Sequence, residues 1–274
     1  MKEKVNFKEL EKAAGQIRRN ILQMLEKAGT GHPGGSLSCV ELMVGLYLAK
    51  MRHDPKNPCW ENRDRFILSK GHGCPTLYAA LSYCGYFPHE ELLTLRSFGS
   101  RLQGHPARCV AMGIEVSSGS LGQGLSIANG LCLAAKMDKK QTRVYCLMGD
   151  GETNEGQVWE AAMTAAHYKL DNLCAIIDFN NQQIDGWLKD VKDMEPYAEK
   201  WKAFAWHVLE INGHDFNEIL TAFDTAEQVK DKPTLILAHT IKGKGVSFME
   251  NNPHWHGVAP NKDELNQALA ELKI

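Results

Sequence analysis

The stretch Gly149–Gly186, which reads GDGETNEGQVWEAAMTAAHYKLDNLCAIIDFNNQQIDG, predicts a βαβ unit. Three segments in and beside it have regular patterns: strand-like residues 143–148, alanine-rich, helix-like residues 158–168 and strand-like residues 173–179. Neighbouring parallel strands end at the same edge of a sheet, so Asp150 and Asn180 should lie side by side there. Open α/β sheets bind their ligands in the crevice at this edge.

The oxygens expected at this edge suit a magnesium ion. Asp150 offers a carboxylate, Asn180 an amide oxygen and Gln182 a main-chain carbonyl, and Mg²⁺ prefers such hard ligands, completed by phosphates and water. The glycines beside Asp150 would let a diphosphate approach the backbone at the start of the following helix. GDG and NN are also common turns, but their separation and their places at two strand ends favour a metal and diphosphate site.

Histidines in glycine-rich or proline-rich loops form the second signal. They occur in Thr30–Gly35 (TGHPGG), Ser69–Gly73 (SKGHG), Gln103–Pro106 (QGHP) and His254–Gly257 (HWHG). On a tight loop an imidazole and backbone NH groups can face the same ligand. Any one of these histidines could be a surface or capping residue, whereas four such loops predict a shared anionic or proton-shuttling pocket. The remaining histidines are expected to be ordinary helix, strand or surface residues: His53, His89, His167, His207, His214 and His239.

The rest of the chain continues the alternation of strands and helices. Helices are expected at residues 7–27, 37–51, 75–84, 88–96, 122–137, 195–204, 216–230 and 262–272, and further strands at 65–69, 206–211 and 233–239. This alternation predicts an α/β fold with a doubly wound parallel sheet flanked by helices. The length of 274 residues is compatible with one large domain, residues 1–274.

Composition narrows the function classes. A net charge of −2 with dispersed basic residues argues against nucleic acid or an anionic membrane as partner. The eight cysteines include no CxxC pair, which argues against zinc and disulfide frameworks and favours free thiols in a reducing cytoplasm. The charged, helical N-terminus does not resemble a signal peptide, and no apolar run reaches membrane-spanning length. We therefore expect a soluble, cytoplasmic protein.

Several motifs together resemble the thiamine-diphosphate domain of transketolases. They are Ser117–Gly124 (SSGSLGQG), the GDG to NN unit, the TGHPGGS, LSKGH and QGHP loops, and Lys242–Gly257 (KGKGVSFMENNPHWHG). The resemblance runs in the same order from about Thr30 to the C-terminus. The chain is similar in particular to the N-terminal subunit of split transketolases, which consist of two polypeptides.

The resemblance implies roles for individual residues. The implied magnesium ligands are Asp150, Asn180 and the Gln182 carbonyl, and the implied diphosphate contacts are Gly151, His72 and His256. Around the cofactor rings it places Gly119, Leu121 and Ile184, with Lys242 nearby. His32, His105 and His256 would face the sugar and assist proton transfer, and Glu155 would belong to an acidic network between two active sites. We expect Glu155 in the first turn of its helix, where the dipole tolerates a carboxylate.

The activity implied by this resemblance is transfer of a two-carbon glycolaldehyde unit from a ketose phosphate to an aldose phosphate, with thiamine diphosphate and Mg²⁺. A second subunit carrying the pyrimidine-binding domain would complete an α2β2 heterotetramer. Two alternatives stay open at this point: the α-subunit of a 2-oxo-acid dehydrogenase, which explains the GHP and HWHG loops poorly, and a non-catalytic cofactor-binding module. The chain departs from the commonest pattern at Ala107, where an acid is usual, and at Gln182, where an aliphatic residue is usual.

Overall fold

A five-stranded parallel sheet forms the centre of the molecule. The computed structural model describes residues 6–184 and 186–272. The strands lie in the order β1-β2-β3-β7-β6, all neighbours parallel. Their bounds are β1 (Arg65–Leu68), β2 (Val144–Gly149), β3 (Leu173–Phe179), β6 (His207–Asn212) and β7 (Thr234–His239). Each lies within one residue of an expected strand, and the expected parallel α/β sheet is confirmed.

The strands are apolar along their whole length because both faces of the sheet are covered. In β2, Tyr145 and Leu147 belong to one core cluster, whereas Cys146 and Met148 belong to the other. Residues of β3 divide in the same alternating way, as the two-residue period of a strand requires. Continuous apolar runs are typical of parallel strands buried on both sides.

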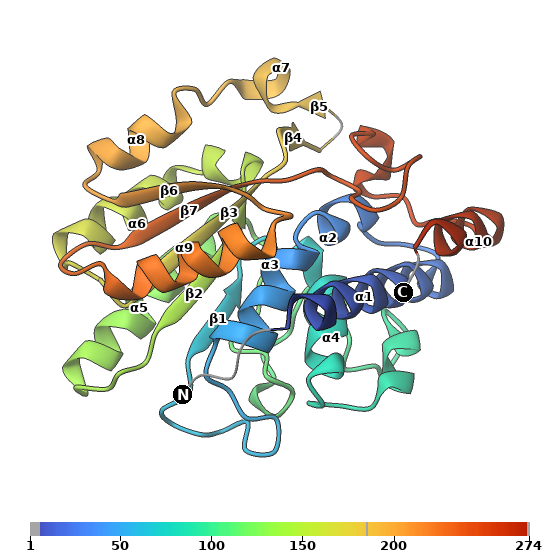
Figure 1. Ribbon diagram of the computed structural model, residues 1–274, viewed down its shortest axis with the longest axis horizontal. Helices are drawn as coiled ribbons and strands as arrows, with labels where there is room; N and C mark the ends of the chain where they lie inside the picture. The colour runs from blue at the N-terminus through green and yellow to red at the C-terminus, as the bar shows by residue number, and fades with distance from the viewer. Residues whose placement is uncertain (1–5, 185, 273–274) are drawn as a thin grey trace.

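Helices cover the two faces of the sheet (Figure 1). One core cluster contains side chains of α1 (Phe7–Ala28), α4 (Cys74–Tyr83) and α9 (Phe216–Gln228), and the other those of α5 (Gln123–Met137), α6 (Gly156–His167) and α8 (Tyr197–Ala203). The final helix, α10 (Lys262–Glu271), packs along α1 (Figure 1). All these helices lie within two residues of their expected bounds. In the part of the chain described here, no helix has the length and hydropathy to cross a membrane.

The helix expected over residues 37–51 is wrong as a single helix. The chain forms α2 (Pro33–Leu37), breaks at Cys39, forms α3 (Val40–Val44) and continues as a π-helix, Gly45–Lys50. The wider turn begins at Gly45, where an added Cβ would lie 2.9 Å from the side chain of Ile219 in α9. Close approach of α9 therefore accompanies a local π geometry that the apolar pattern does not reveal.

The helix expected over residues 88–96 is also wrong in type, because the chain forms only a 3-10 helix, His89–Thr94. Arg96 follows with φ of 61°, a left-handed conformation that prevents helical continuation.

Several short elements were not expected from the sequence. They are the 3-10 helices Gly71–Gly73, Val110–Met112, Gly151–Asn154 and Pro253–His256, the hairpin β4 (Gln182–Gln183) and β5 (Gly186–Trp187), and α7 (Leu188–Lys192).

The buried centre of β3 should dominate stability. Ile176 is 1 % exposed between β2 and β7, so Ile176→Ala should lower the free energy of unfolding by about 2–5 kcal/mol through lost burial and a cavity. Val191→Ala is a control in α7, 51 % exposed, and should change it by no more than about 0.5 kcal/mol. Urea unfolding measures both values. Equal values for the two variants would contradict this description of the core.

Candidate functional site

The loops that follow β1, β2, β3 and β7 converge at the carboxyl edge of the sheet. Gly149 at the end of β2 pairs in register with Asp178, and Phe179 at the end of β3 pairs with His239. The parallel register therefore brings the GDG turn and the asparagine pair together, as the spacing predicts. A cavity of about 330 Å³ lies at this edge.

Every site residue expected from the sequence lines this one cavity. They are His32, His72, His105, Gly119, Leu121, Asp150, Gly151, Glu155, Asn180, Gln182, Ile184, Lys242 and His256. Segments between residues 32 and 256, far apart in the sequence, thus line one cavity. Gly35, Lys70, Glu152 and Gln183 also line the cavity, and sequence reasoning had assigned them no role.

Oxygen atoms gather in one corner of the cavity. Asp150 is 2 % exposed, and its carboxylate accepts hydrogen bonds from the amides of Gly151 at 2.7 Å and Asn181 at 2.6 Å. Burial and the negative charge of Asp178 raise the pKa of Asp150 to about 7. The side-chain oxygen of Asn180 accepts a hydrogen bond from the backbone amide of Gln182 at 3.1 Å. A cation here would compensate a buried carboxylate whose charged form is otherwise disfavoured.

The donor set of this corner suits a hard metal ion. Among residues 6–184 and 186–272, no group of three His, Cys, Asp or Glu side chains could hold a metal ion. The corner instead offers one carboxylate, one amide oxygen and backbone carbonyls. Such oxygen ligands, with phosphate and water completing the shell, suit Mg²⁺ rather than zinc.

Four imidazoles form a cluster in the same cavity. Ring centroids lie 5.3 Å apart for His32 and His256, 5.4 Å for His32 and His72, and 5.5 Å for His72 and His256. His105 lies 6.1 Å from His32. Sequence positions spread over more than two hundred residues are therefore brought into direct proximity.

Burial and nearby cations keep these imidazoles neutral. Burial, with the charges of Arg96, His105, Lys242 and Lys70, lowers the pKa of His32 to about 4. Burial, with Lys242, His32 and Lys70, lowers the pKa of His256 to about 3, and the pKa of His72 falls for similar reasons. Burial and Arg96 lower the pKa of His105. A positive field that repels protons from four histidines also attracts an anion.

Two local features of the wall point to a ligand. Nδ1 of His256 is buried and has no hydrogen-bond partner among the described residues. Ile184, at the turn between β4 and β5, is 59 % exposed and has φ of 50°, an unusual conformation for a β-branched residue. An unsatisfied polar atom and a left-handed backbone at a β-branched residue, both at one cavity, are typical of functional sites.

The two acids after the GDG turn have different positions. Glu155 lines the cavity but is the N-cap residue of α6 and does not lie in its first turn as expected. Glu152 is 3 % exposed and accepts hydrogen bonds from the Ser69 hydroxyl and from the amides of Gly122 at 2.9 Å and Gly149 at 3.0 Å. Glu152 therefore holds three cavity loops together, a role that only its burial reveals.

A buried ion pair at the cavity, between Lys70 and Asp178, was also missed. Lys70 is 1 % exposed and donates to the Gly35 carbonyl at 2.8 Å and to Asp178, which is fully buried. Burial alone would raise the pKa of Asp178, but Lys70 and hydrogen bonds from Lys70, Ser38 and Thr240 outweigh it and lower that pKa. The available signal was a charged residue just after an apolar strand, Lys70 in LSKGH, and another within an apolar strand, Asp178 in LCAIIDF.

The two departures from the usual pattern differ in importance. Ala107 is exposed and does not line the cavity. Gln182 is 4 % exposed, and both polar atoms of its side-chain amide are buried without a partner among the described residues. The polar side chain of Gln182 therefore leaves two buried polar atoms without a partner in the described protein, which an aliphatic residue would not.

Comparison with known proteins gives a consistent family. Residues 10–273 match the family model described as "Transketolase, thiamine diphosphate binding domain". The chain is 46 % identical over 265 residues to the 6-deoxy-6-sulfo-D-fructose transketolase subunit SqwG of Clostridium sp., covering 97 % of this chain and 96 % of that one. It is 44 % identical to an apulose-4-phosphate transketolase subunit of Phocaeicola vulgatus, covering 96 % and 93 %.

Longer proteins match over part of their length. The transketolase of Pongo abelii is 42 % identical over 96 % of this chain but only 42 % of its own length. The crystal structure of transketolase from Campylobacter jejuni superimposes with a TM-score of 0.90 at 34 % identity, covering 98 % of this chain and 43 % of that one. The fold at this site is therefore shared with solved transketolases.

The lowered histidine pKa values predict a pH-dependent stability. The unfolded chain takes up protons below about pH 6.5, whereas folded His256 stays neutral down to a pKa of about 3, so stability falls as the pH drops from 6.5. His256→Phe removes this titration and should lose less stability than the wild type between pH 7 and pH 5. Urea unfolding of cofactor-free protein at both pH values measures the difference. Equal losses would show that His256 does not resist protonation.

Proposed function

This chain belongs to the transketolase family, and we propose that it is the thiamine-diphosphate-binding subunit of a transketolase completed by a second chain. One observation carries the proposal: a carboxylate and amide corner and a cluster of four imidazoles line the same cavity at the sheet edge. The relatives named above are transketolases or their subunits, so the chain is a component of a transferase. The 2-oxo-acid dehydrogenase alternative is not favoured.

We assign Mg²⁺ to the oxygen corner. Asp150, Asn180 and the Gln182 carbonyl would hold the ion, because they supply neighbouring hard oxygens on a buried wall. The raised pKa of Asp150 supports a cation at this place, since a positive ion would favour the ionised carboxylate. The backbone amide of Gln182 donates to the side-chain oxygen of Asn180, which keeps the two ligand-bearing residues together.

The diphosphate would lie between this ion and the basic wall. Gly151, His72 and His256 are the proposed contacts, with the Lys242 ammonium close by. The unpartnered Nδ1 of His256 supports an oxygen ligand there. Gly119, Leu121 and Ile184 would contact the cofactor rings, and φ of 153° at Gly119 is a conformation that other residues rarely adopt.

Bound thiamine diphosphate would supply an electron sink that allows a carbon–carbon bond beside a carbonyl to break. The side chains of this subunit would orient the substrate and move protons. His32 and His256 are neutral at pH 7, so each can accept a proton from a sugar hydroxyl or share a hydrogen bond with it. His105, which is exposed at the same cavity, would contact the substrate nearer to solvent.

We propose a ketose phosphate as donor and an aldose phosphate as acceptor. The relatives named for 6-deoxy-6-sulfo-D-fructose and apulose-4-phosphate support ketoses that carry an anionic group. The positive field around His32, from Arg96, Lys242 and Lys70, is compatible with such donors.

We also propose a cytoplasmic location, which the free state of all eight cysteines supports.

We propose that a C-terminal transketolase subunit with a pyrimidine-binding domain completes the enzyme as an α2β2 heterotetramer. Relatives of matching length are named as subunits, whereas full-length transketolases are more than twice as long as the matched region. Glu155 lines the cavity at the start of α6, and we propose that it links two active sites across the assembly. A non-catalytic module is not favoured either, because the relatives of matching length are named as transketolase subunits.

Asp150→Ala should abolish stabilisation of the protein by thiamine diphosphate and Mg²⁺. A ligand bound only by the folded state contributes about 2.7 kcal/mol at a hundredfold excess over its dissociation constant, and the variant lacks the only charged protein ligand. Thermal melts with and without cofactor measure the effect. Asp190→Ala, an exposed acid in α7, is the control and should respond like the wild type. Equal responses of the wild type and Asp150→Ala would refute the metal assignment.

Transfer of a two-carbon unit should require both chains and the histidines. The purified chain with cofactor alone should be inactive, and addition of a C-terminal transketolase subunit should restore ketose-to-aldose transfer. In the restored complex, His32→Ala should lower turnover by about 10²-fold, the usual contribution of a positioned acid or base. Product formation from a ketose phosphate and an aldose phosphate measures the rates. Robust transfer by the chain alone would refute the two-chain proposal, and no transfer in any mixture would favour the non-catalytic module.

A further inference from the structure

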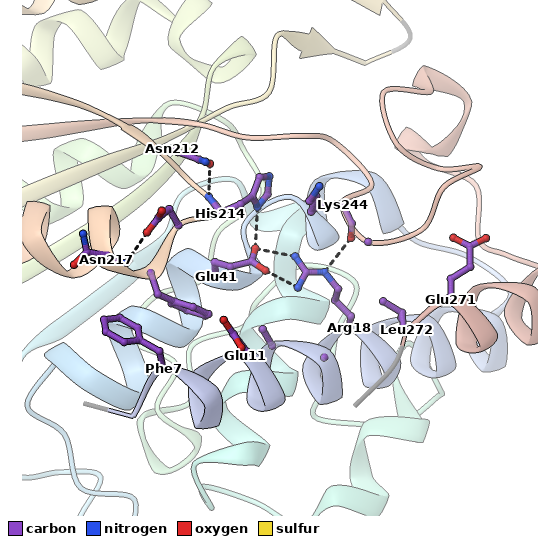
Figure 2. A pocket seen from close by; sticks show the side chains of 15 residues that line it. Phe7, Glu11, Arg18, Glu41, Asn212, His214, Asn217, Lys244, Glu271 and Leu272 are labelled. Carbon is purple, nitrogen blue, oxygen red and sulfur yellow. Dashed lines mark hydrogen bonds and ion pairs between the residues drawn. The ribbon is translucent and has the colours of Figure 1, made fainter. Parts of the chain in front are cut away.

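A buried charge network lies beside the loop that carries Lys242 and Lys244, and Figure 2 shows it next to Lys244. Arg18 of α1 binds both carboxylate oxygens of Glu41 in α3, at 2.6 Å and 2.7 Å. His214, between β6 and α9, binds the same carboxylate through Nδ1 at 2.9 Å. Arg18 and Glu41 are 6 % and 8 % exposed. The three side chains line a solvent-open cavity of about 710 Å³ that is separate from the cofactor cavity.

The network attaches to the loop on both sides of Lys242. The backbone amide of Ile241 donates to Nε2 of His214 at 2.9 Å. Nε of Arg18 donates to the Lys244 carbonyl at 2.9 Å (Figure 2). Gly245 packs so closely on Arg18 that an added Cβ would lie 2.9 Å from its side chain. The loop is therefore held at residues 241, 244 and 245, directly around the lysine.

The direction of these hydrogen bonds identifies the tautomer of His214. An amide N–H can donate only to a ring nitrogen without a hydrogen, so Nε2 is unprotonated and Nδ1 carries the hydrogen given to Glu41. Burial alone would raise the pKa of Glu41, but Arg18 and His214 outweigh it and lower that pKa to about 2. The ionised Glu41 thus fixes both the guanidinium of Arg18 and the tautomer of His214.

Lys242 connects this network to the cofactor cavity. It is 2 % exposed and lines that cavity, where its charge contributes to the low pKa values of His32 and His256. Its ammonium donates to the Ile184 carbonyl at 3.4 Å, on the opposite hairpin turn. A shift of the backbone at residues 241–244 would therefore move a cation of the basic wall. None of Arg18, Glu41 and His214 lines the cofactor cavity itself.

We infer that Arg18, Glu41 and His214 are positioning residues that hold the backbone around Lys242, and through it the ammonium, at the diphosphate subsite. The inference rests on the proposed function for its consequence in cofactor binding. The attachment of the loop can be measured independently of that function.

The test compares His214→Phe, which keeps a planar ring but loses both hydrogen bonds, with His214→Gln, whose carbonyl oxygen can still accept from the Ile241 amide. His239→Phe is the matched control, because His239 also pairs with a glutamate, Glu210, at 3.3 Å, but both side chains are 49 % exposed. Hydrogen exchange at the Ile241 amide of the free protein should become faster in His214→Phe and stay as in the wild type in His239→Phe. His214→Gln should restore protection at least in part.

Cofactor binding gives the second measurement. In the complex with the C-terminal subunit, His214→Phe and Lys242→Met should each weaken the affinity for Mg²⁺ and thiamine diphosphate by roughly tenfold, the effect of one lost interaction with a charged group. The double variant should be no weaker than Lys242→Met, since both changes act on the same ammonium. A purely structural role of His214 would instead make the two losses multiply.

The outcomes separate the two hypotheses. Unchanged exchange at Ile241 in His214→Phe would overturn the positioning role, and so would wild-type cofactor affinity in that variant or multiplying losses in the double variant. Absence of cofactor binding by the wild-type complex would refute the proposed function. In that case the exchange experiment would still decide whether the network holds the loop.

Discussion

The buried ion pair between Lys70 and Asp178 is the interaction on which the arrangement of the cavity depends. Asp178, at the carboxyl end of the central strand β3, accepts hydrogen bonds from Lys70, Thr240, Ser38 at 2.6 Å and Asn180 at 3.2 Å. Its partners come from the loops after β1, β3 and β7 and from the break before α3. Removing one member of such a buried pair typically costs about 3–5 kcal/mol because the other charge is left uncompensated.

This pair also polarises the cavity. The carboxylate of Asp178 helps to raise the pKa of Asp150. Asp178 also accepts a hydrogen bond from the side-chain nitrogen of Asn180, so this contact does not use the side-chain oxygen of Asn180. The ammonium of Lys70 instead lowers the pKa values of His72 and His256, which line the same cavity. An anionic ligand chelating a cation would complement this separation of charge, because each end would meet the opposite sign.

Repetitive patterns explain which parts of the fold could be predicted. The five strands and most helices follow from apolar periodicity, since both faces of a parallel sheet must be buried. The break at Cys39 and the π-helix after Gly45 could not be predicted in this way, because contacts of Ser38 with Asp178 and of Gly45 with α9 join residues far apart in the chain. The same holds for His214, expected to be ordinary, whose partners are Glu41 and Ile241.

The sequence by itself determined the sheet, the order of its loops and the residue types of the candidate site, because strand ends and glycine turns are local properties. Only the tertiary structure decided which polar residues are buried and paired. Glu152 and Glu155 stand three positions apart in one acidic stretch, yet the first is enclosed by three loops and the second caps α6 at the cavity wall. Burial sets the charge state and the partners of such groups, and burial is a property of distant segments packed together, which no local pattern records.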